Sequence, residues 1–194
     1  MKKGLLIVLS GPSGVGKGTV RKAIIAKRKI RFTYSISMTT RAPRNKEVDG
    51  RDYYFVSHEE FDRNIELGNF LEYTSFVGNK YGTPKDKVDA LRDQGKNVFL
   101  EIEINGATQV LNRLKQENDN RVISFFLKPP SLQDLENRIR KRRSETEDVI
   151  RERLNKGAAE MEMTDAYDHV ILNDEIDRAA EEIISLIKAK QYEK

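Results

Sequence analysis

Short runs of apolar residues alternate along the chain with stretches in which apolar positions recur every three or four residues. The runs are typical of buried strands, and the longer spacing is typical of helices that cover a sheet with one face. Strands are expected over residues 5–9, 32–37, 53–56, 70–77, 98–104, 122–127 and 169–172. Helices are expected over residues 19–29, 58–67, 85–94, 107–116, 132–142, 147–163 and 175–190. Alternation of this kind predicts an α/β fold with a parallel sheet.

Local signals mark the ends of several helices. Ser57 is followed three residues later by Glu60, a capping-box pattern that predicts a helix start. Gly68 and Gly95 follow predicted helices where a C-terminal glycine is favoured, and Pro84 suits the first turn of the next helix. These signals support the predicted helix boundaries.

Two stretches interrupt the alternation. Residues 38–52 carry no apolar period, and residues 128–147 begin with two prolines and contain a basic run at 138–143. Neither stretch is a repeat or a low-complexity linker. The sequence therefore predicts a compact core with two inserted segments, and such segments often close over ligands.

Composition narrows the class of protein. The chain has 194 residues, 35 basic and 31 acidic side chains, a formal charge of +4 and no cysteine. The net charge is too small to indicate a nucleic-acid partner, and the missing cysteines exclude disulfides and thiol chemistry. The apolar run after residue 4 is too short for a signal peptide or a membrane span. We expect a cytoplasmic protein with no membrane partner.

The most distinctive segment joins the first predicted strand to the first predicted helix. It reads Gly11-Pro12-Ser13-Gly14-Val15-Gly16-Lys17-Gly18-Thr19. Gly-x-x-x-x-Gly-Lys in this context is a P-loop, whose backbone N–H groups cradle phosphates while the lysine reaches the β- and γ-phosphates. We expect residues 11–19 to bind the phosphates of ATP, with Lys17 as a catalytic residue.

A second set of side chains surrounds the first insertion. It consists of Ser37, Arg41, Arg44, Tyr53, Glu72, Tyr81 and Thr83. Two arginines with two tyrosine hydroxyls could surround a monophosphate dianion. The Glu72 carboxylate could accept from N1–H and the 2-amino group of guanine, a donor pair that adenine lacks. Hydroxyls of Ser37 and Thr83 could serve guanine O6.

These motifs resemble the signature of guanylate kinases over essentially the whole chain. The resemblance rests on residues 37–44, Gly50-Arg51-Asp52-Tyr53, Tyr81-Gly82-Thr83, Pro129-Pro130-Ser131, the 142–147 region and Asn173-Asp174. It implies an α/β P-loop NTPase core of three layers, a GMP-binding insertion and a helical lid. It implies the reaction ATP + GMP ⇌ ADP + GDP. It also implies that Ser37, Glu72 and Thr83 contact guanine and that the two arginines and two tyrosines hold the phosphate.

Two carboxylates follow the apolar strand that precedes residue 104. Alternation along that strand places Glu101 and Glu103 on one face, at the edge where ligands bind. Guanylate kinases usually carry Asp at both places, so both are departures. We expect Glu101 to face Mg²⁺ through water and Glu103 to approach the GMP site near Arg41. Because Gly18 replaces the usual P-loop hydroxyl, phosphates and water should hold most of the metal, with Thr19 a weak contributor.

The second insertion supplies arginines for a lid. Arg138 and Arg142 lie four residues apart on one helical face, and Arg153 follows on the next predicted helix. We expect Arg142 and Arg153 to be catalytic, Arg138 to bind ATP, and Asn173 to lie near the adenine. A general base is not required, because the attacking phosphate oxygen of GMP is already anionic.

The predicted function is ATP-dependent phosphorylation of GMP, with dGMP a further expected acceptor, in purine nucleotide metabolism and the recycling of GMP. The expected parts are a core (1–37, 84–127, 156–194), a GMP-binding region (38–83) and a lid (128–155). The oligomeric state is expected to be a monomer or homodimer. Two alternatives stay open: a non-catalytic module that binds phosphorylated peptides, and a kinase of a phosphorylated sugar.

Overall fold

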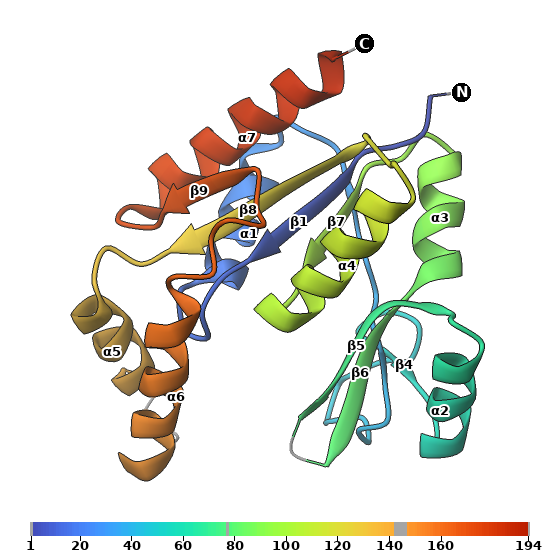
Figure 1. Cartoon of the computed structure of the whole chain (residues 1–194), viewed down its shortest axis with the longest axis horizontal. Coiled ribbons are helices and arrows are strands. Elements are labelled where there is room, and N and C mark those ends of the chain that lie inside the picture. Colours follow the sequence, from blue (N-terminus) through green and yellow to red (C-terminus); the bar gives the residue numbers. More distant parts are fainter. Residues whose placement is uncertain (1, 77, 142–146, 194) are drawn as a thin grey trace. The chain divides into compact units, whose positions relative to one another are not determined.

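The structure, a computed structural model, describes residues 2–76, 78–141 and 147–193. Its strands are β1 (Leu6–Ser10), β2 (Thr33–Tyr34), β3 (Met38–Thr39), β4 (Tyr54–Phe55), β5 (Phe70–Phe76), β6 (Asn79–Pro84), β7 (Val98–Glu101), β8 (Val122–Lys128) and β9 (His169–Leu172). Its helices are α1 (Lys17–Lys27), α2 (His58–Glu66), α3 (Lys85–Asp93), α4 (Ile104–Gln116), α5 (Leu132–Arg140), α6 (Glu147–Glu160) and α7 (Ile176–Tyr192) (Figure 1).

The strands form two sheets. The larger sheet has the order β2-β7-β1-β8-β9, and both β2 with β7 and β8 with β9 pair in parallel. The smaller sheet has the order β4-β3-β6-β5, with antiparallel pairs between β3 and β6 and between β5 and β6. The prediction of an α/β fold with a parallel sheet is confirmed.

The second sheet contains two strands that the apolar pattern does not predict. β3 is two residues long and lies in the stretch without an apolar period, while β6 reads Asn-Lys-Tyr-Gly-Thr-Pro. Pairing with β5 along most of its length gives β6 its extended form. Strand assignment here depends on cross-strand partners more than on local propensity.

The predicted boundary between the strand at 98–104 and the helix at 107–116 is wrong. β7 ends at Glu101 and α4 already begins at Ile104. Ile102 and Ile104 continue the apolar alternation of the strand, and short apolar runs of this kind do not distinguish a strand from a helix. Glu103 therefore lies between the two elements, and strand alternation does not place it on the face of Glu101.

The chain divides into two compact units. One contains the residues up to Leu6 with Phe32–Leu100 and Asn105–Arg121, and the other contains Ile7–Arg31, Glu101–Ile104 and the chain from Val122 onward. In the second unit α7 packs on α1 and β9, and α5 lies beside α6 (Figure 1). Among the described residues, no helix combines the length and the apolar character needed to cross a membrane.

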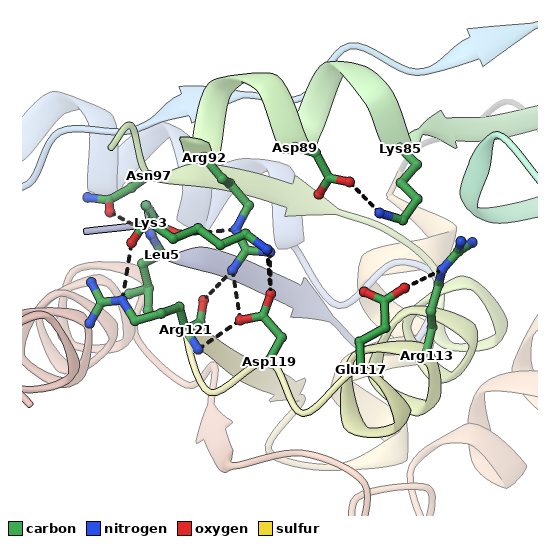
Figure 2. Close-up of polar contacts among 11 residues, drawn as sticks. Lys3, Leu5, Lys85, Asp89, Arg92, Asn97, Arg113, Glu117, Asp119 and Arg121 are labelled. Atoms are coloured by element: carbon green, nitrogen blue, oxygen red, sulfur yellow. Dashed lines mark hydrogen bonds and ion pairs between the residues drawn. The ribbon is translucent and has the colours of Figure 1, made fainter. Parts of the chain in front are cut away.

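The first unit has an apolar centre and a buried polar cluster. Phe61 of α2 stacks on Phe70 of β5 with ring centroids 4.5 Å apart. The Arg92 guanidinium, 1% exposed, donates to both carboxylate oxygens of Asp119 at 2.9 and 3.1 Å, and Lys3 donates to the same carboxylate at 3.0 Å (Figure 2). Arg92 also donates to the carbonyl oxygens of Gly4 and Arg121. The cluster ties the N-terminal segment to the ends of α3 and α4.

Acid should weaken this cluster. Burial alone would raise the pKa of Asp119, but hydrogen bonds from Arg92 and Lys3 outweigh it and lower the pKa to about 2. Because the folded-state pKa lies below the ordinary value of about 3.9, the carboxylate stabilises the fold above that value. The stabilisation, about 2 kcal/mol, is lost as the pH falls from about 4 to 2.

The substitution Asp119→Asn should lower the free energy of unfolding by about 2 kcal/mol at pH 7, because it leaves the buried Arg92 without its counter-charge. Urea unfolding at pH 7 and at pH 3, followed by tyrosine fluorescence, measures the loss and its pH dependence. Asp89→Asn is the matched control, since Asp89 pairs with Lys85 near the surface of the same unit. An acid dependence as steep in Asp119→Asn as in the parent would contradict the assignment.

Candidate functional site

The loop between β1 and α1 has the conformation that the glycines predict. Gly11, Gly14 and Gly16 have φ values of 143°, 90° and 104°. L side chains rarely adopt these values, and Gly16 is the residue that caps α1. The helix begins at Lys17, two residues earlier than predicted, so its N-terminal N–H groups and its positive dipole end lie at the loop. The strand–loop–helix arrangement can hold an anion.

The Lys17 side chain folds over its own loop. Its Nζ donates to the carbonyl oxygens of Gly11 at 2.6 Å and Pro12 at 3.2 Å. A bound phosphate oxygen would offer a stronger, charge-assisted acceptor for the same ammonium group. The lysine is therefore placed at the mouth of the loop.

Arg138 and Asn173 both bind the backbone of this loop at Val15. Arg138 Nη1 and Asn173 Nδ2 both donate to the backbone carbonyl oxygen of Val15, at 2.8 and 2.7 Å. Arg138 Nη2 donates to the backbone carbonyl oxygen of Asn173 at 2.7 Å. Asn173 is 2% exposed, and its Oδ1 has no hydrogen-bond partner within the described part of the chain. A cavity of about 480 Å³ lies against Gly14, Gly16, Arg138 and Asn173. The cavity borders this residue, while the Oδ1 atom itself is buried.

A second arginine reaches the loop from α6. Arg153 Nη2 donates to the Ser13 hydroxyl at 2.6 Å. The helix after the second insertion thus places a cation at the phosphate loop, and the catalytic role of Arg153 stays a prediction. Arg142 lies outside the described residues.

Glu101, at the end of β7, lies against the start of α1. Arg21 Nε donates to Glu101 Oε2 at 2.7 Å, and a Cβ atom at Gly18 would lie 3.3 Å from Glu101 Oε1. The carboxylate therefore occupies the space beside the position where a P-loop usually has its hydroxyl. Among the described residues, no group of three or more His, Asp or Glu side chains could hold a metal by itself.

Two further predictions concern Thr19, as a metal contact, and Glu103, as a contact of the acceptor nucleotide. Thr19 is exposed in the first turn of α1. Glu103 lies 3.7 Å from Lys156 of α6, in the same unit as Glu101. Its predicted approach to Arg41 stays a prediction.

The predicted phosphate contacts gather in the other unit. Arg41 makes a two-pronged pair with Glu47, with both N–O distances 3.0 Å, and Glu47 also accepts from the backbone N–H of Arg44 at 2.7 Å. The pair with Glu47 raises the pKa of Arg41, and the hydrogen bonds from Arg41 and Arg44 lower the pKa of Glu47. The Glu47 carboxylate thus occupies a position in which Arg41 could hold a phosphate.

Aromatic rings surround this arginine. The guanidinium carbon of Arg41 lies 5.4 Å from the Tyr53 ring centroid, and the Tyr53 and Tyr81 rings meet edge to face at 6.3 Å. The backbone carbonyl of Ser37 accepts from the Tyr54 N–H at 2.9 Å, which ties the segment before β3 to β4. The structure therefore brings Arg41, Tyr53 and Tyr81 together, and their role in holding the phosphate stays a prediction.

The predicted base contact is buried. Glu72, 5% exposed on β5, accepts at 2.6 Å from the Thr83 hydroxyl on the paired strand β6. A bulge between Phe70 and Glu72 shifts the strand register, so Phe70 packs on α2 while Glu72 pairs with Thr83. The structure thus holds a buried carboxylate next to a hydroxyl, a pair that suits a donor-rich base edge.

A cavity of about 510 Å³ in the same unit lies elsewhere. Met38, Tyr54, Phe55 and Asn64 are among the residues that line it, and none of the seven predicted acceptor contacts does. The predicted phosphate- and base-binding residues therefore lie outside this cavity.

Sequence reasoning misses three residues that shape these sites. Glu47 pairs with Arg41, Arg21 holds Glu101, and Gly106 lies against Glu72. Charged residues abound in this chain, so a single Glu or Arg gives no signal. Gly106 gives no signal either, because the predicted helix begins only at residue 107, and its place in the first turn of α4 appears only in the structure.

Comparisons with known proteins match this chain to guanylate kinases over nearly its whole length. The guanylate kinase family model matches residues 3–190. A guanylate kinase of Bacillus anthracis is 52% identical over 186 residues, covering 96% of this chain and 88% of that protein. One from Bacillus subtilis (strain 168) is 48% identical over 193 residues, covering 100% and 92%. The crystal structure of the Anaplasma phagocytophilum guanylate kinase is similar, with a TM-score of 0.73 at 32% identity, covering 99% of this chain and 88% of that one.

Proposed function

Because the chain belongs to the guanylate kinase family, it catalyses ATP-dependent phosphorylation of GMP, and we propose which of its residues carry the reaction. The observation that carries the assignment of residues is the buried Glu72–Thr83 pair in the unit that also holds Arg41, Tyr53 and Tyr81. A buried carboxylate is costly unless a charged or donor-rich partner compensates it. Guanine supplies two such donors.

On the donor side, the P-loop amides and Lys17 bind the phosphates of ATP, helped by the N-terminus of α1. Arg153 and Arg142 add charge that stabilises the phosphates during transfer, and Arg138 fixes the loop from behind. The adenine lies in the cavity beside Asn173, whose Oδ1 accepts from the 6-amino group. The position of this cavity, between the phosphate loop and Asn173, supports that placement.

On the acceptor side, Arg41, Arg44, Tyr53 and Tyr81 hold the GMP phosphate. Ser37 serves guanine O6, Glu72 accepts from N1–H and the 2-amino group, and Glu103 approaches the same nucleotide. Thr83 has one hydroxyl proton, which it donates to Glu72, so it serves O6 only when the hydroxyl turns from the carboxylate to the base. In this assignment the phosphate takes over part of the bonding that Arg41 now gives to Glu47. Arginine suits the role because its planar fork matches two phosphate oxygens.

The chemistry needs position and charge more than proton transfer. The GMP phosphate oxygen is already anionic, so its attack on the γ-phosphorus requires alignment and stabilisation of the equatorial oxygens. Exclusion of water by the lid would limit hydrolysis of ATP. Lys17 and the arginines align the phosphates and stabilise the charge on the equatorial oxygens.

Kinases of this family generally use a divalent metal with ATP, and we propose Mg²⁺ here. When bound with ATP the metal neutralises charge on the phosphates. The residues beside the loop suit a metal that is bound through water. Gly18 offers no hydroxyl for direct coordination, whereas Glu101 brings a carboxylate to that side of the loop. Glu101 would hold the metal through water, with Thr19 as a weak contributor.

Replacing Glu101 by glutamine should weaken metal binding to the ATP complex about tenfold, since it removes one charge near the cation and keeps the side chain's shape. Electron paramagnetic resonance of free Mn²⁺, titrated with protein and ATP, measures this without turnover. Lys22→Ala, an exposed change on α1, is the control. Unaltered Mn²⁺ affinity in Glu101→Gln would leave Glu101 as a structural partner of Arg21 only.

Product analysis tests the proposal. Phosphorus-31 NMR of ATP and GMP with the protein should show ADP and GDP forming in equal amounts, with little inorganic phosphate. A module that only binds phosphorylated peptides would leave both nucleotides unchanged. Hydrolysis of ATP without GDP would contradict the acceptor assignment.

The remaining expectations belong to the same proposal. We place the protein in the cytoplasm as a monomer or homodimer, acting in purine nucleotide metabolism and accepting dGMP as well as GMP. Its parts are a core, a GMP-binding region at 38–83 and a lid at 128–155. Neither nucleic acid nor membrane is a partner in this proposal.

A further inference from the structure

Gly106, in the first turn of α4, lies against the Glu72 carboxylate. A Cβ atom built at Gly106 would lie 2.7 Å from Glu72 Oε2, 3.1 Å from Cδ and 3.3 Å from Cγ. Ordinary contacts begin near 3.4 Å, so a methyl group would require the oxygen to move by about 0.7 Å. The glycine thus leaves a space that the carboxylate fills.

The neighbouring elements leave little room for another relaxation. The other carboxylate oxygen, Glu72 Oε1, accepts from the Thr83 hydroxyl at 2.6 Å. α4 is fixed to β5 on both sides of Glu72: Gln109 exchanges two hydrogen bonds with the Tyr73 backbone, and Arg113 donates to the Phe70 carbonyl at 2.7 Å. A side chain at residue 106 would therefore displace the carboxylate rather than the helix.

Gly106 has no conformational reason to be glycine. Its φ lies outside the left-handed range, and alanine is the more stable residue in a helix. The cost of keeping glycine here is offset by the space given to Glu72.

We propose that Gly106 is a positioning residue for guanine selection, because it lets both oxygens of Glu72 lie where they can accept from N1–H and the 2-amino group. This inference rests on the proposed role of Glu72. Two parallel hydrogen bonds need both oxygens near the plane of the base, so a shift of about 0.7 Å breaks at least one of them. No atom of residue 106 contacts the base in this proposal.

Gly106→Ala should therefore lower GMP affinity about tenfold and leave ATP affinity unchanged. Calorimetric titrations with GMP, IMP and ATP measure this. IMP keeps N1–H but lacks the 2-amino group, so it should lose less affinity and the preference for GMP over IMP should shrink. Asn112→Ala, an exposed change on the same helix, should alter none of these values.

Thermal unfolding separates the steric cause from a general effect on the helix. In a Glu72→Ala background, Gly106→Ala should raise Tm by about 2 °C, as alanine normally does in a helix. In the parent background the same change should leave Tm unchanged or lower it. A Tm change that is positive without Glu72 and zero or negative with it would show that residue 106 and the Glu72 carboxylate are in steric contact.

The outcomes are distinguishable. If Glu72→Ala leaves GMP affinity intact, the proposed role of Glu72 fails. If Glu72→Ala weakens GMP binding but Gly106→Ala does not, the inference about Gly106 is overturned while the proposed function stands. The inference is also overturned if Gly106→Ala shifts Tm equally in both backgrounds, or weakens GMP and ATP binding alike.

Discussion

Replacing Lys17 by alanine should lower kcat for GDP formation by about 10²- to 10⁴-fold, because the ammonium group is the P-loop's mobile charge on the β- and γ-phosphates. In the structure this group donates to carbonyl oxygens of its own loop, at Gly11 and Pro12, so its loss should leave the fold intact. A coupled assay of ADP release at saturating GMP measures the rate, and Tm checks the fold.

Lys22→Ala is the matched control, since Lys22 is an exposed lysine on the same helix. It should turn over at the parent rate. Near-normal kcat in Lys17→Ala, with Tm unchanged, would contradict the proposed role of the loop.

Glu72→Ala should reduce kcat/KM for GMP about 10³-fold while the KM for ATP stays the same. A site built to accept two hydrogen bonds loses more than contact area when the acceptor is removed, because the donors of the base are then buried without partners. Steady-state kinetics with each nucleotide varied in turn gives both parameters.

The substitution Glu59→Ala controls for removal of a carboxylate, because Glu59 is exposed in the first turn of α2. Thr83→Val should fall between the control and Glu72→Ala, since it removes the hydroxyl that donates to Glu72 but leaves the carboxylate itself in place. Equal losses for GMP and ATP in Glu72→Ala would show that the residue supports the fold and does not select guanine.

The order of most elements could be predicted from the sequence, because strands and helices of a parallel α/β fold differ in apolar period. The capping signals at Ser57, Gly68 and Gly95 are confirmed as well. The Ser57 hydroxyl accepts from the Glu60 N–H at the start of α2, and Gly68 and Gly95 have positive φ after α2 and α3. β3 and β6 cannot be predicted from the apolar pattern, because their extended form comes from partners in the sheet. The apolar pattern predicts the end of β7 three residues too late, because Ile102 and Ile104 fit both a strand and the start of a buried helix.

The candidate site could be predicted as a set of residues but not as a set of contacts. The P-loop spacing locates Lys17 and its glycines because the backbone geometry that phosphate needs is local. That Arg41 pairs with Glu47, or that Arg138 bonds to the Val15 carbonyl, depends on where loops and helices come to lie. The same holds for Gly106 and Glu72, which are 34 residues apart and meet only through the packing of α4 on β5.

Acceptor discrimination is the most direct test of the central claim, that a P-loop donor site serves a guanine-selective acceptor site. The rate of ADP release should be measured with GMP, AMP, UMP and a ribose bisphosphate side by side at saturating ATP. We predict turnover with GMP at least about 10²-fold above that with each of the others. Turnover with the sugar phosphate or AMP equal to that with GMP, or no ADP release with any acceptor, would contradict the account.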